Sequence, residues 1–169
     1  MAHLTDIVVE DPRWNELNLQ DLAERSAVNT LIHNGIQPSE HEVAILACDD
    51  ERIAMLNADF RGKPTPTNVL SWPETELFAE ADGGIPDKPP AVYGGEKGFL
   101  GDVAIAFDTC QREANDAGKP MHHHVSHLIV HGILHLLGYD HVRDRDATLM
   151  EGIETEILGK MGIPDPYRG

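Results

Sequence analysis

The pattern of apolar and polar positions changes period along the chain, and each period predicts one type of element. Short runs rich in β-branched residues predict four strands. These runs cover residues 4–9, 42–48, 67–72 and 101–106. Apolar residues at helical spacing predict helices between and after the strands. The two longest helices are expected at about residues 121–137 and 143–161.

Cap and turn residues predict where the earlier helices begin and end. Asn18 resembles an N-cap, and the helix that follows it is expected to run to Gly35. Asp49 and Asp50 cap a second helix, which is expected to stop at Gly62. Each of these helices therefore has a start signal and a stop signal in the sequence.

The alternation of strands and helices predicts the fold class. Asp108 is expected to cap one more helix, which ends at about residue 117. Four short strands with interspersed helices indicate an α+β (α/β-like) fold, a single mixed β-sheet of about four strands packed with helices. Residues 1–169 are expected to form one domain. Residues 73–98 are acidic and rich in proline and glycine, which predicts a flexible acidic loop.

Histidine is concentrated in one part of the chain. Seven of the ten histidines fall between residues 122 and 141. His131 and His135 are four positions apart on a predicted helix, so both project from one face and can share an ion. Gly138 can adopt the left-handed conformation that ends a helix, which lets His141 turn back toward them. The sequence therefore predicts a metal site of three histidines at the end of a long central helix.

The ligand type indicates which metal and which chemistry to expect. Three neutral imidazoles with an open fourth position are typical of catalytic zinc, because structural zinc sites are closed and usually contain cysteine. One Zn²⁺ ion would favour hydrolysis, since it lowers the pKa of a bound water and stabilises charge on an oxygen. The alternative is a histidine-rich helix that packs on the core. His124 and His127 are expected to pack or face solvent unless they contact the site, and Asp140 either orients an imidazole or forms the turn.

The residue after the first histidine separates two classes of hydrolase. In the metzincin peptidases, with the pattern H-E-x-x-H-x-x-G-x-x-H, a glutamate at that position is the general base. In this chain the position is Gly132. Loss of a general base commonly costs a factor of about 10² to 10⁴ in rate. A metallopeptidase is therefore the less favoured alternative.

Two segments carry a resemblance to a known family. HGILHLLGYDH, at residues 131–141, resembles the signature H-G-x-L-H-L-x-G-Y-D-H of the YbeY endoribonuclease family. LNADFRGKPTPTNVLSWP, at residues 56–73, is similar to that family's L-N-x-x-Y-R-x-x-x-x-x-T-D-V-L-S-F-P segment. Phe60, Asn68 and Trp72 replace the family's tyrosine, aspartate and phenylalanine, and only Asn68 changes the charge. The resemblance covers most of the chain from residue 4 to about residue 161.

The resemblance implies a function. It implies a metal-dependent endoribonuclease, specific for single-stranded RNA, that acts in maturation of the 16S rRNA 3′ end and in ribosome quality control. The family's arginine falls on Arg61, whose guanidinium can hold a phosphate bidentately and offset charge in the transition state. Alternatively, Arg61 is a helix-end cation beside Gly62 that favours the macrodipole. Lys63, Thr67 and Ser71 are candidates for further phosphate contacts.

The net charge and the terminal sequence bear on partners and location. A net charge of −16 counts against an RNA partner, because RNA-binding proteins usually carry clustered Lys and Arg. It encourages a different hypothesis, a ribosome-binding assembly factor whose metal is structural. The first residues lack a basic segment followed by an apolar one, and no stretch approaches the roughly 20 apolar residues of a membrane helix. A cytoplasmic protein without membrane contact is therefore expected.

Overall fold

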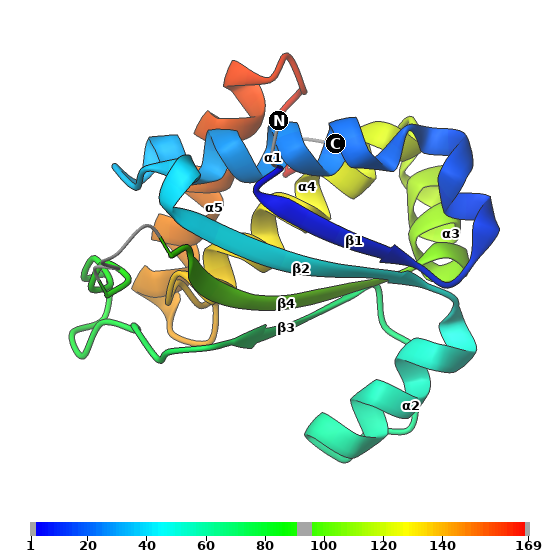
Figure 1. Cartoon of the computed structure of the whole chain (residues 1–169), viewed down its shortest axis with the longest axis horizontal. Coiled ribbons are helices and arrows are strands. Elements are labelled where there is room, and N and C mark those ends of the chain that lie inside the picture. Colours follow the sequence, from blue (N-terminus) through cyan, green and yellow to red (C-terminus); the bar gives the residue numbers. More distant parts are fainter. Residues whose placement is uncertain (1–2, 91–95, 168–169) are drawn as a thin grey trace.

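A four-stranded sheet lies at the centre of the computed structural model, which describes residues 3–90 and 96–167 (Figure 1). The strands are β1 (Thr5–Val9), β2 (His41–Cys48), β3 (Val69–Pro73) and β4 (Gly98–Ala106). Their order across the sheet is β1, β2, β4, β3. Strands β1, β2 and β4 are parallel, and β3 runs antiparallel to β4 at one edge. The sheet is therefore mixed, which confirms the predicted fold class.

Helices cover both faces of this sheet. The α-helices are α1 (Leu19–His33), α2 (Asp50–Arg61), α3 (Phe107–Ala117), α4 (Met121–Leu136) and α5 (Asp144–Lys160), and two short 3-10 helices are η1 (Pro12–Leu17) and η2 (Pro38–Glu40). Figure 1 shows α1, α4 and α5 on one side of the sheet and α2 on the other. Each 3-10 helix begins with a proline, whose fixed φ suits a first turn, although neither was expected from the sequence. Within residues 3–90 and 96–167, no helix is both long enough and apolar enough to cross a bilayer.

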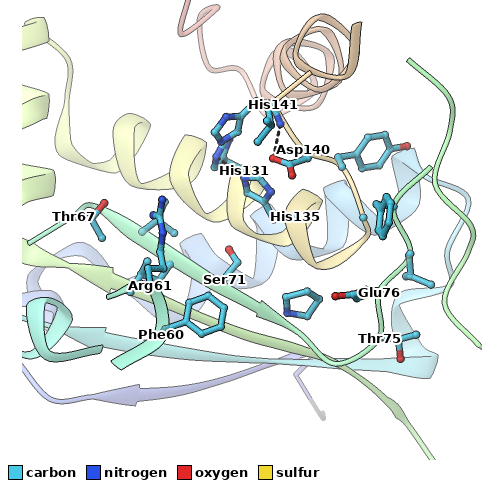
Figure 2. Close-up of a pocket in the computed structure, with 18 of the residues that line it drawn as sticks. Phe60, Arg61, Thr67, Ser71, Thr75, Glu76, His131, His135, Asp140 and His141 are labelled. Atoms are coloured by element: carbon cyan, nitrogen blue, oxygen red, sulfur yellow. Dashed lines mark hydrogen bonds between the residues drawn. The ribbon is translucent and has the colours of Figure 1, made fainter. Parts of the chain in front are cut away.

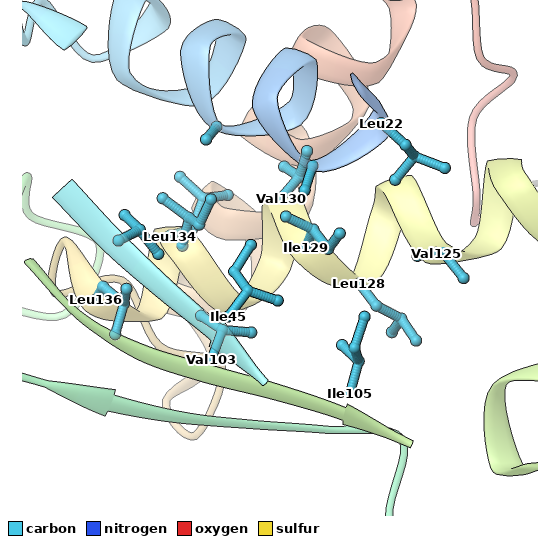
Figure 3. Packing of buried hydrophobic residues seen from close by; sticks show 14 of the residues in the cluster. Leu22, Ile45, Val103, Ile105, Val125, Leu128, Ile129, Val130, Leu134 and Leu136 are labelled. Carbon is cyan, nitrogen blue, oxygen red and sulfur yellow. The ribbon is translucent and has the colours of Figure 1, made fainter. Parts of the chain in front are cut away.

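Helix α4 packs against the sheet and against α1 and α5, and it contributes much of the main core (Figure 3). Ile129, Ile133 and Leu134 of α4 are buried in one cluster with Val103 and Ile105 of β4. Full burial of one such side chain contributes roughly 1.5–3 kcal/mol. This packing fixes the position of α4, which carries two of the predicted ligands.

A smaller cluster lies under α2, on the opposite face of the sheet. Its buried members are Cys48, Ile53, Leu70, Ala104 and Ala106. The Asp49 side chain accepts a hydrogen bond from the backbone nitrogen of Arg52 at 2.8 Å, so it caps α2 as predicted. Gly62 ends the helix with φ of +70°. Helix α2 thus places Arg61 at its last turn.

Several expected element ends differ from those observed, among them the start of β3, which is Val69 instead of Thr67. Helix α3 begins at Phe107, so Asp108 lies in its first turn instead of at the cap. The Asp108 carboxylate pairs with Arg13 at 2.6 Å, and its charge favours the start of the helix dipole. Strand β4 begins at Gly98 instead of Gly101, because its pairing with β2 continues past a β-bulge.

The described part of the acidic loop rests against the start of α5. Arg143 donates hydrogen bonds to the carbonyl oxygens of Ala79 and Glu80, both at 2.7 Å. The backbone nitrogen of Asp146 donates to the carboxylate of Asp82 at 2.9 Å. Residues 91–95 lie outside the described residues, and the flexibility of the loop stays a prediction. The segment before residue 80 also lies beside the turn that follows α4, because Leu77 and Phe78 are close to Gly138.

Candidate metal centre

The three predicted ligands converge at the end of α4 (Figure 2). The Nε2 atoms of His131 and His135 lie 3.0 Å apart. The ring centroid of His141 lies 5.2 Å from that of His131 and 5.0 Å from that of His135. One nitrogen of each ring lies within 4.8 Å of the others. These residues, which we name the three-histidine group, can hold one metal ion.

The turn that returns His141 to the end of α4 depends on Gly138. Its φ is +100°, a value that residues with a side chain rarely adopt. A Cβ atom at this position would lie 2.7 Å from the carbonyl carbon of Leu77 and 2.9 Å from the backbone nitrogen of Phe78. Both the backbone angle and the available space therefore require glycine, which supports the predicted helix stop.

Gly132 lies where α4 packs closely on the sheet. A Cβ atom there would lie 3.0 Å from Cγ1 of Val103 and 3.2 Å from Oγ of Ser71. The Ser71 hydroxyl donates to the carbonyl oxygen of Gly132 at 3.2 Å. A glutamate at this position would press its Cβ against Val103 and Ser71, so these neighbours would have to shift. This packing is a physical argument against the metallopeptidase alternative, because the base of that class belongs at this position.

A buried carboxylate lies behind the three-histidine group. Glu154 of α5 is fully buried, and its Oε1 lies 3.1 Å from Nδ1 of His131 and 2.9 Å from Nε2 of His127. The hydroxyl of Tyr167 donates to both carboxylate oxygens, at 2.9 and 2.8 Å. His127, His131 and Glu154 form a second set whose potential ligand atoms lie within 4.8 Å of one another, so His131 belongs to both sets.

Burial and nearby charges determine the protonation of these groups. Burial and the other two rings of the three-histidine group lower the pKa of His135 to about 4, so its ring is neutral at pH 7. Burial raises the pKa of Glu154, but hydrogen bonds from His127 and His131 outweigh that effect and bring it to about 2. Burial and the Glu154 carboxylate raise the pKa of Tyr167. At pH 7 the carboxylate is therefore ionised and the phenol is a donor.

The three-histidine group opens into a cavity of about 600 Å³. Arg61, Thr67 and Ser71 line the same cavity, as Figure 2 shows. The side chain of Arg61 forms no hydrogen bond or ion pair with any residue in the described ranges 3–90 and 96–167. Phe60 and Phe78 also line the cavity, and their side chains are more than half exposed. The cavity thus combines potential metal ligands, apolar rings and a cation whose side chain has no partner among the described residues.

The remaining sequence candidates have other contacts. Lys63 is exposed and does not line the cavity. The carboxylate of Asp140 accepts a hydrogen bond from the backbone nitrogen of His141 at 2.7 Å, which is the contact of a turn-forming residue. Nε2 of His124 lies 2.9 Å from the carboxylate of Glu113, away from the three-histidine group. His124 therefore packs as expected, whereas His127 reaches the network behind the metal centre.

Glu154 and Tyr167 are not among the residues predicted from the sequence. Glu154 follows His131 by 23 positions, so no local spacing connects the two residues. One signal was present, because Glu154 interrupts the apolar stripe of α5. The buried apolar positions of that stripe are Met150, Ile157 and Leu158. A charged residue in such a stripe is rare unless its charge is paired.

The sequence of the chain matches a known protein family. The family model described as "Endoribonuclease YbeY" matches residues 7–162, which is most of the chain. The chain belongs to the YbeY endoribonuclease family. Membership in the YbeY family confirms the resemblance found in the sequence, and it confirms the predicted enzyme class, a nuclease that hydrolyses phosphodiesters, at the level of the family.

Relatives within the YbeY family match over nearly their full length. The chain is 60% identical over 162 residues to the endoribonuclease YbeY of Ruegeria pomeroyi, and the match covers 96% of each chain. It is 52% identical over 167 residues to that of Cereibacter sphaeroides, over 99% of this chain and 100% of the relative. A solution structure of a Thermotoga maritima protein matches with a TM-score of 0.54 and 21% identity, over 98% of this chain and 99% of that one. The last comparison supports the fold alone.

Asn68 is the position at which this chain departs in charge from the YbeY segment. Its Nδ2 donates to the carboxylate of Glu113 at 2.9 Å, and its Oδ1 accepts from the backbone nitrogen of Val69 at 2.7 Å. An aspartate could not donate to Glu113, because an ionised carboxylate only accepts hydrogen bonds. In this chain Asn68 therefore joins the wall of the cavity to α3 through an amide.

Proposed function

We propose that this chain is a zinc-dependent endoribonuclease that cleaves single-stranded RNA in the cytoplasm. It acts in maturation of the 16S rRNA 3′ end and in ribosome quality control, with precursor 16S rRNA and the small ribosomal subunit as partners. Family membership supports the cleavage of RNA. The observation that carries the metal dependence is the convergence of three imidazoles beside a cavity that also holds Arg61.

The donor set fits zinc. Nitrogen ligands at about 2.0–2.1 Å from zinc are about 3.4 Å apart in a tetrahedral site, so the 3.0 Å separation of His131 and His135 suits a shared ion. The low pKa of His135 keeps its nitrogen free of a proton at pH 7. The fourth side of the group faces the cavity. Zinc bound there would act as a Lewis acid on a phosphoryl oxygen and would lower the pKa of water.

Arg61 is the candidate for binding the scissile phosphate. Its guanidinium has no partner among the described residues, so it retains its full set of donors for a ligand. It lines the cavity together with the three-histidine group, so a phosphodiester in the cavity can reach both. A guanidinium binds two phosphate oxygens at once and offsets the charge that develops in the transition state.

Metal content and turnover of matched variants test this proposal. We expect about one zinc ion per wild-type chain, and loss of that ion in the single alanine variants of the three-histidine group. Arg61→Ala should keep the metal but lose about 10² to 10³-fold in turnover of single-stranded RNA. Arg52→Ala is the control, because Arg52 is on the same helix but pairs with Glu10 outside the cavity. Unchanged turnover of Arg61→Ala would remove Arg61 from the mechanism.

The net charge of −16 favours a second candidate, a ribosome-binding assembly factor with a structural metal. A structural metal predicts that His135→Ala unfolds the domain, whereas a catalytic metal predicts a folded variant without cleavage activity. Circular dichroism and an RNA cleavage assay on the same sample separate the two outcomes. End-group analysis of the cleaved RNA then identifies the nucleophile, because a 2′,3′-cyclic phosphate indicates attack by the ribose 2′-hydroxyl.

A further inference from the structure

The carboxylate of Glu154 connects the candidate metal centre to the C-terminal segment. It is fully buried, and removing a carboxylate from water is strongly unfavourable unless its oxygens accept hydrogen bonds. Its partners come from α4, through His127 and His131, and from the segment after α5, through Tyr167. Three donors from two separate parts of the chain therefore meet on one buried charge.

The direction of the hydrogen bond to His131 sets the state of that ring. An ionised carboxylate only accepts, so the Nδ1 atom of His131 must carry the hydrogen in this contact. The Nε2 atom then has the lone pair, and it is the atom that lies 3.0 Å from Nε2 of His135. A carboxylate that holds the far nitrogen of a metal-binding histidine fixes its tautomer and its ring orientation.

We propose that Glu154 is the positioning residue of the metal centre, which presents Nε2 of His131 to the ion, and that Tyr167 in turn holds Glu154. This inference rests on the proposed zinc site. It makes the C-terminal segment part of the site, although Tyr167 does not line the cavity.

The contacts of Tyr167 show how the C-terminal segment holds Glu154. Its hydroxyl donates to both oxygens of Glu154, so it restricts rotation of the carboxylate. Its ring packs edge-on against His127, with centroids 5.5 Å apart. Its backbone nitrogen donates to the side chain of Asp165 at 2.9 Å, which holds the turn that brings the ring inward. The segment therefore reaches Glu154 through an ordered set of contacts.

Zinc affinity is the direct test. Glu154→Gln keeps the size of the side chain but leaves one acceptor oxygen for three donors. We expect its zinc affinity to fall about 10- to 100-fold, measured by competition with a chromophoric chelator. The visible absorption spectrum of the Co²⁺-loaded variant should also differ from that of the wild type, because the ring of His131 is no longer held in place. Tyr167→Phe should show a smaller loss in the same direction, since the histidine contacts remain.

Glu113→Gln is the matched control. The carboxylate of Glu113 lies 2.9 Å from Nε2 of His124, the same distance as that between Glu154 and His127. His124 is on α4, as His131 is, but it is outside the three-histidine group. Its zinc affinity and Co²⁺ spectrum should equal those of the wild type. Wild-type affinity in a folded Glu154→Gln variant would overturn the proposal, and so would two zinc ions per wild-type chain that fall to one in this variant.

Two further outcomes distinguish a failure of this inference from a failure of the proposed function. If the wild type binds no zinc, the proposed function fails, and this inference fails with it. If the wild type binds zinc but Glu154→Gln does not fold, Tyr167→Phe decides. Wild-type zinc affinity and an unchanged Co²⁺ spectrum in Tyr167→Phe would then overturn the role of Tyr167 in holding Glu154.

Discussion

Replacing Gly138 by alanine tests the turn on which the metal centre depends. The chain has φ of +100° at this residue, so the variant must either adopt an unfavourable backbone conformation or move the turn. The added Cβ would also lie 2.7 Å from the carbonyl carbon of Leu77 and 2.9 Å from the backbone nitrogen of Phe78. These neighbours are backbone atoms, which cannot rotate away as a flexible side chain can.

The magnitude follows from two contributions. A residue with a side chain in a sparsely populated backbone region costs about 1–3 kcal/mol. Overpacking by one methyl group costs about 1–3 kcal/mol where the neighbours must shift. We expect Gly138→Ala to lower the free energy of unfolding by about 2–6 kcal/mol. Because relief of the clash moves the chain that leads to His141, the zinc affinity should fall as well.

Urea unfolding of the metal-free protein, followed by circular dichroism, measures the effect on stability. Gly152→Ala is the control, since Gly152 lies within α5 and no heavy atom comes within 4 Å of a Cβ built there. Alanine at that position should stabilise the protein by about 0.5–1 kcal/mol, because glycine is unfavourable inside a helix. Equal unfolding free energies for Gly138→Ala and the wild type would refute the reasoning about the turn.

The other predictions concern pH, helix packing and RNA binding. The pKa of His135 is about 4 in the fold against 6.5 ordinarily, so the unfolded chain takes up the proton first as the pH falls. The unfolding free energy of the metal-free protein should therefore drop by up to about 3 kcal/mol between pH 6.5 and pH 4, and His135→Asn should lack this drop in urea titrations. Gly132→Glu should be destabilised by about 1–3 kcal/mol through its contact with Val103, and a stable variant that digests casein would contradict the packing argument. Phe78→Ala should raise KM for single-stranded RNA about tenfold without changing kcat, because a base can stack on the exposed ring, and an unchanged KM would show that it does not.

The elements that could be predicted from the sequence are those whose signals are local. The cap at Asp49, the stop at Gly62 and the apolar run of β2 all depend on neighbours within a few residues, and all are present. The start of β4 depends on pairing with β2, a strand far away in the sequence, so the pattern placed it too late. The proline that begins η1 is typical of a turn as well as of a helix start, so the sequence alone does not separate the two.

The residues of the candidate site fall into the same two groups, those that local sequence signals predict and those that they do not. The three-histidine group could be predicted because helical spacing and one glycine determine where its rings point. Glu154, Tyr167 and Phe78 could not, because α5, the C-terminal segment and the acidic loop reach the site only through tertiary packing. A charged residue within an apolar helical stripe is the one sequence signal that would have identified Glu154.

The position of the histidines bears on whether the fold needs its metal. Ile129 and Ile133 of α4 are buried in the main core, whereas His131 is 19% exposed and His141 lies at the surface. The core therefore closes without the three-histidine group, unlike a zinc finger, in which the ion replaces a core. Among the described residues, Glu154 is the fully buried charge beside the group, and hydrogen bonds from His127, His131 and Tyr167 satisfy it without any ion. An ion bound to the three-histidine group would therefore not be needed to pair this buried charge, which favours a catalytic ion over a structural one.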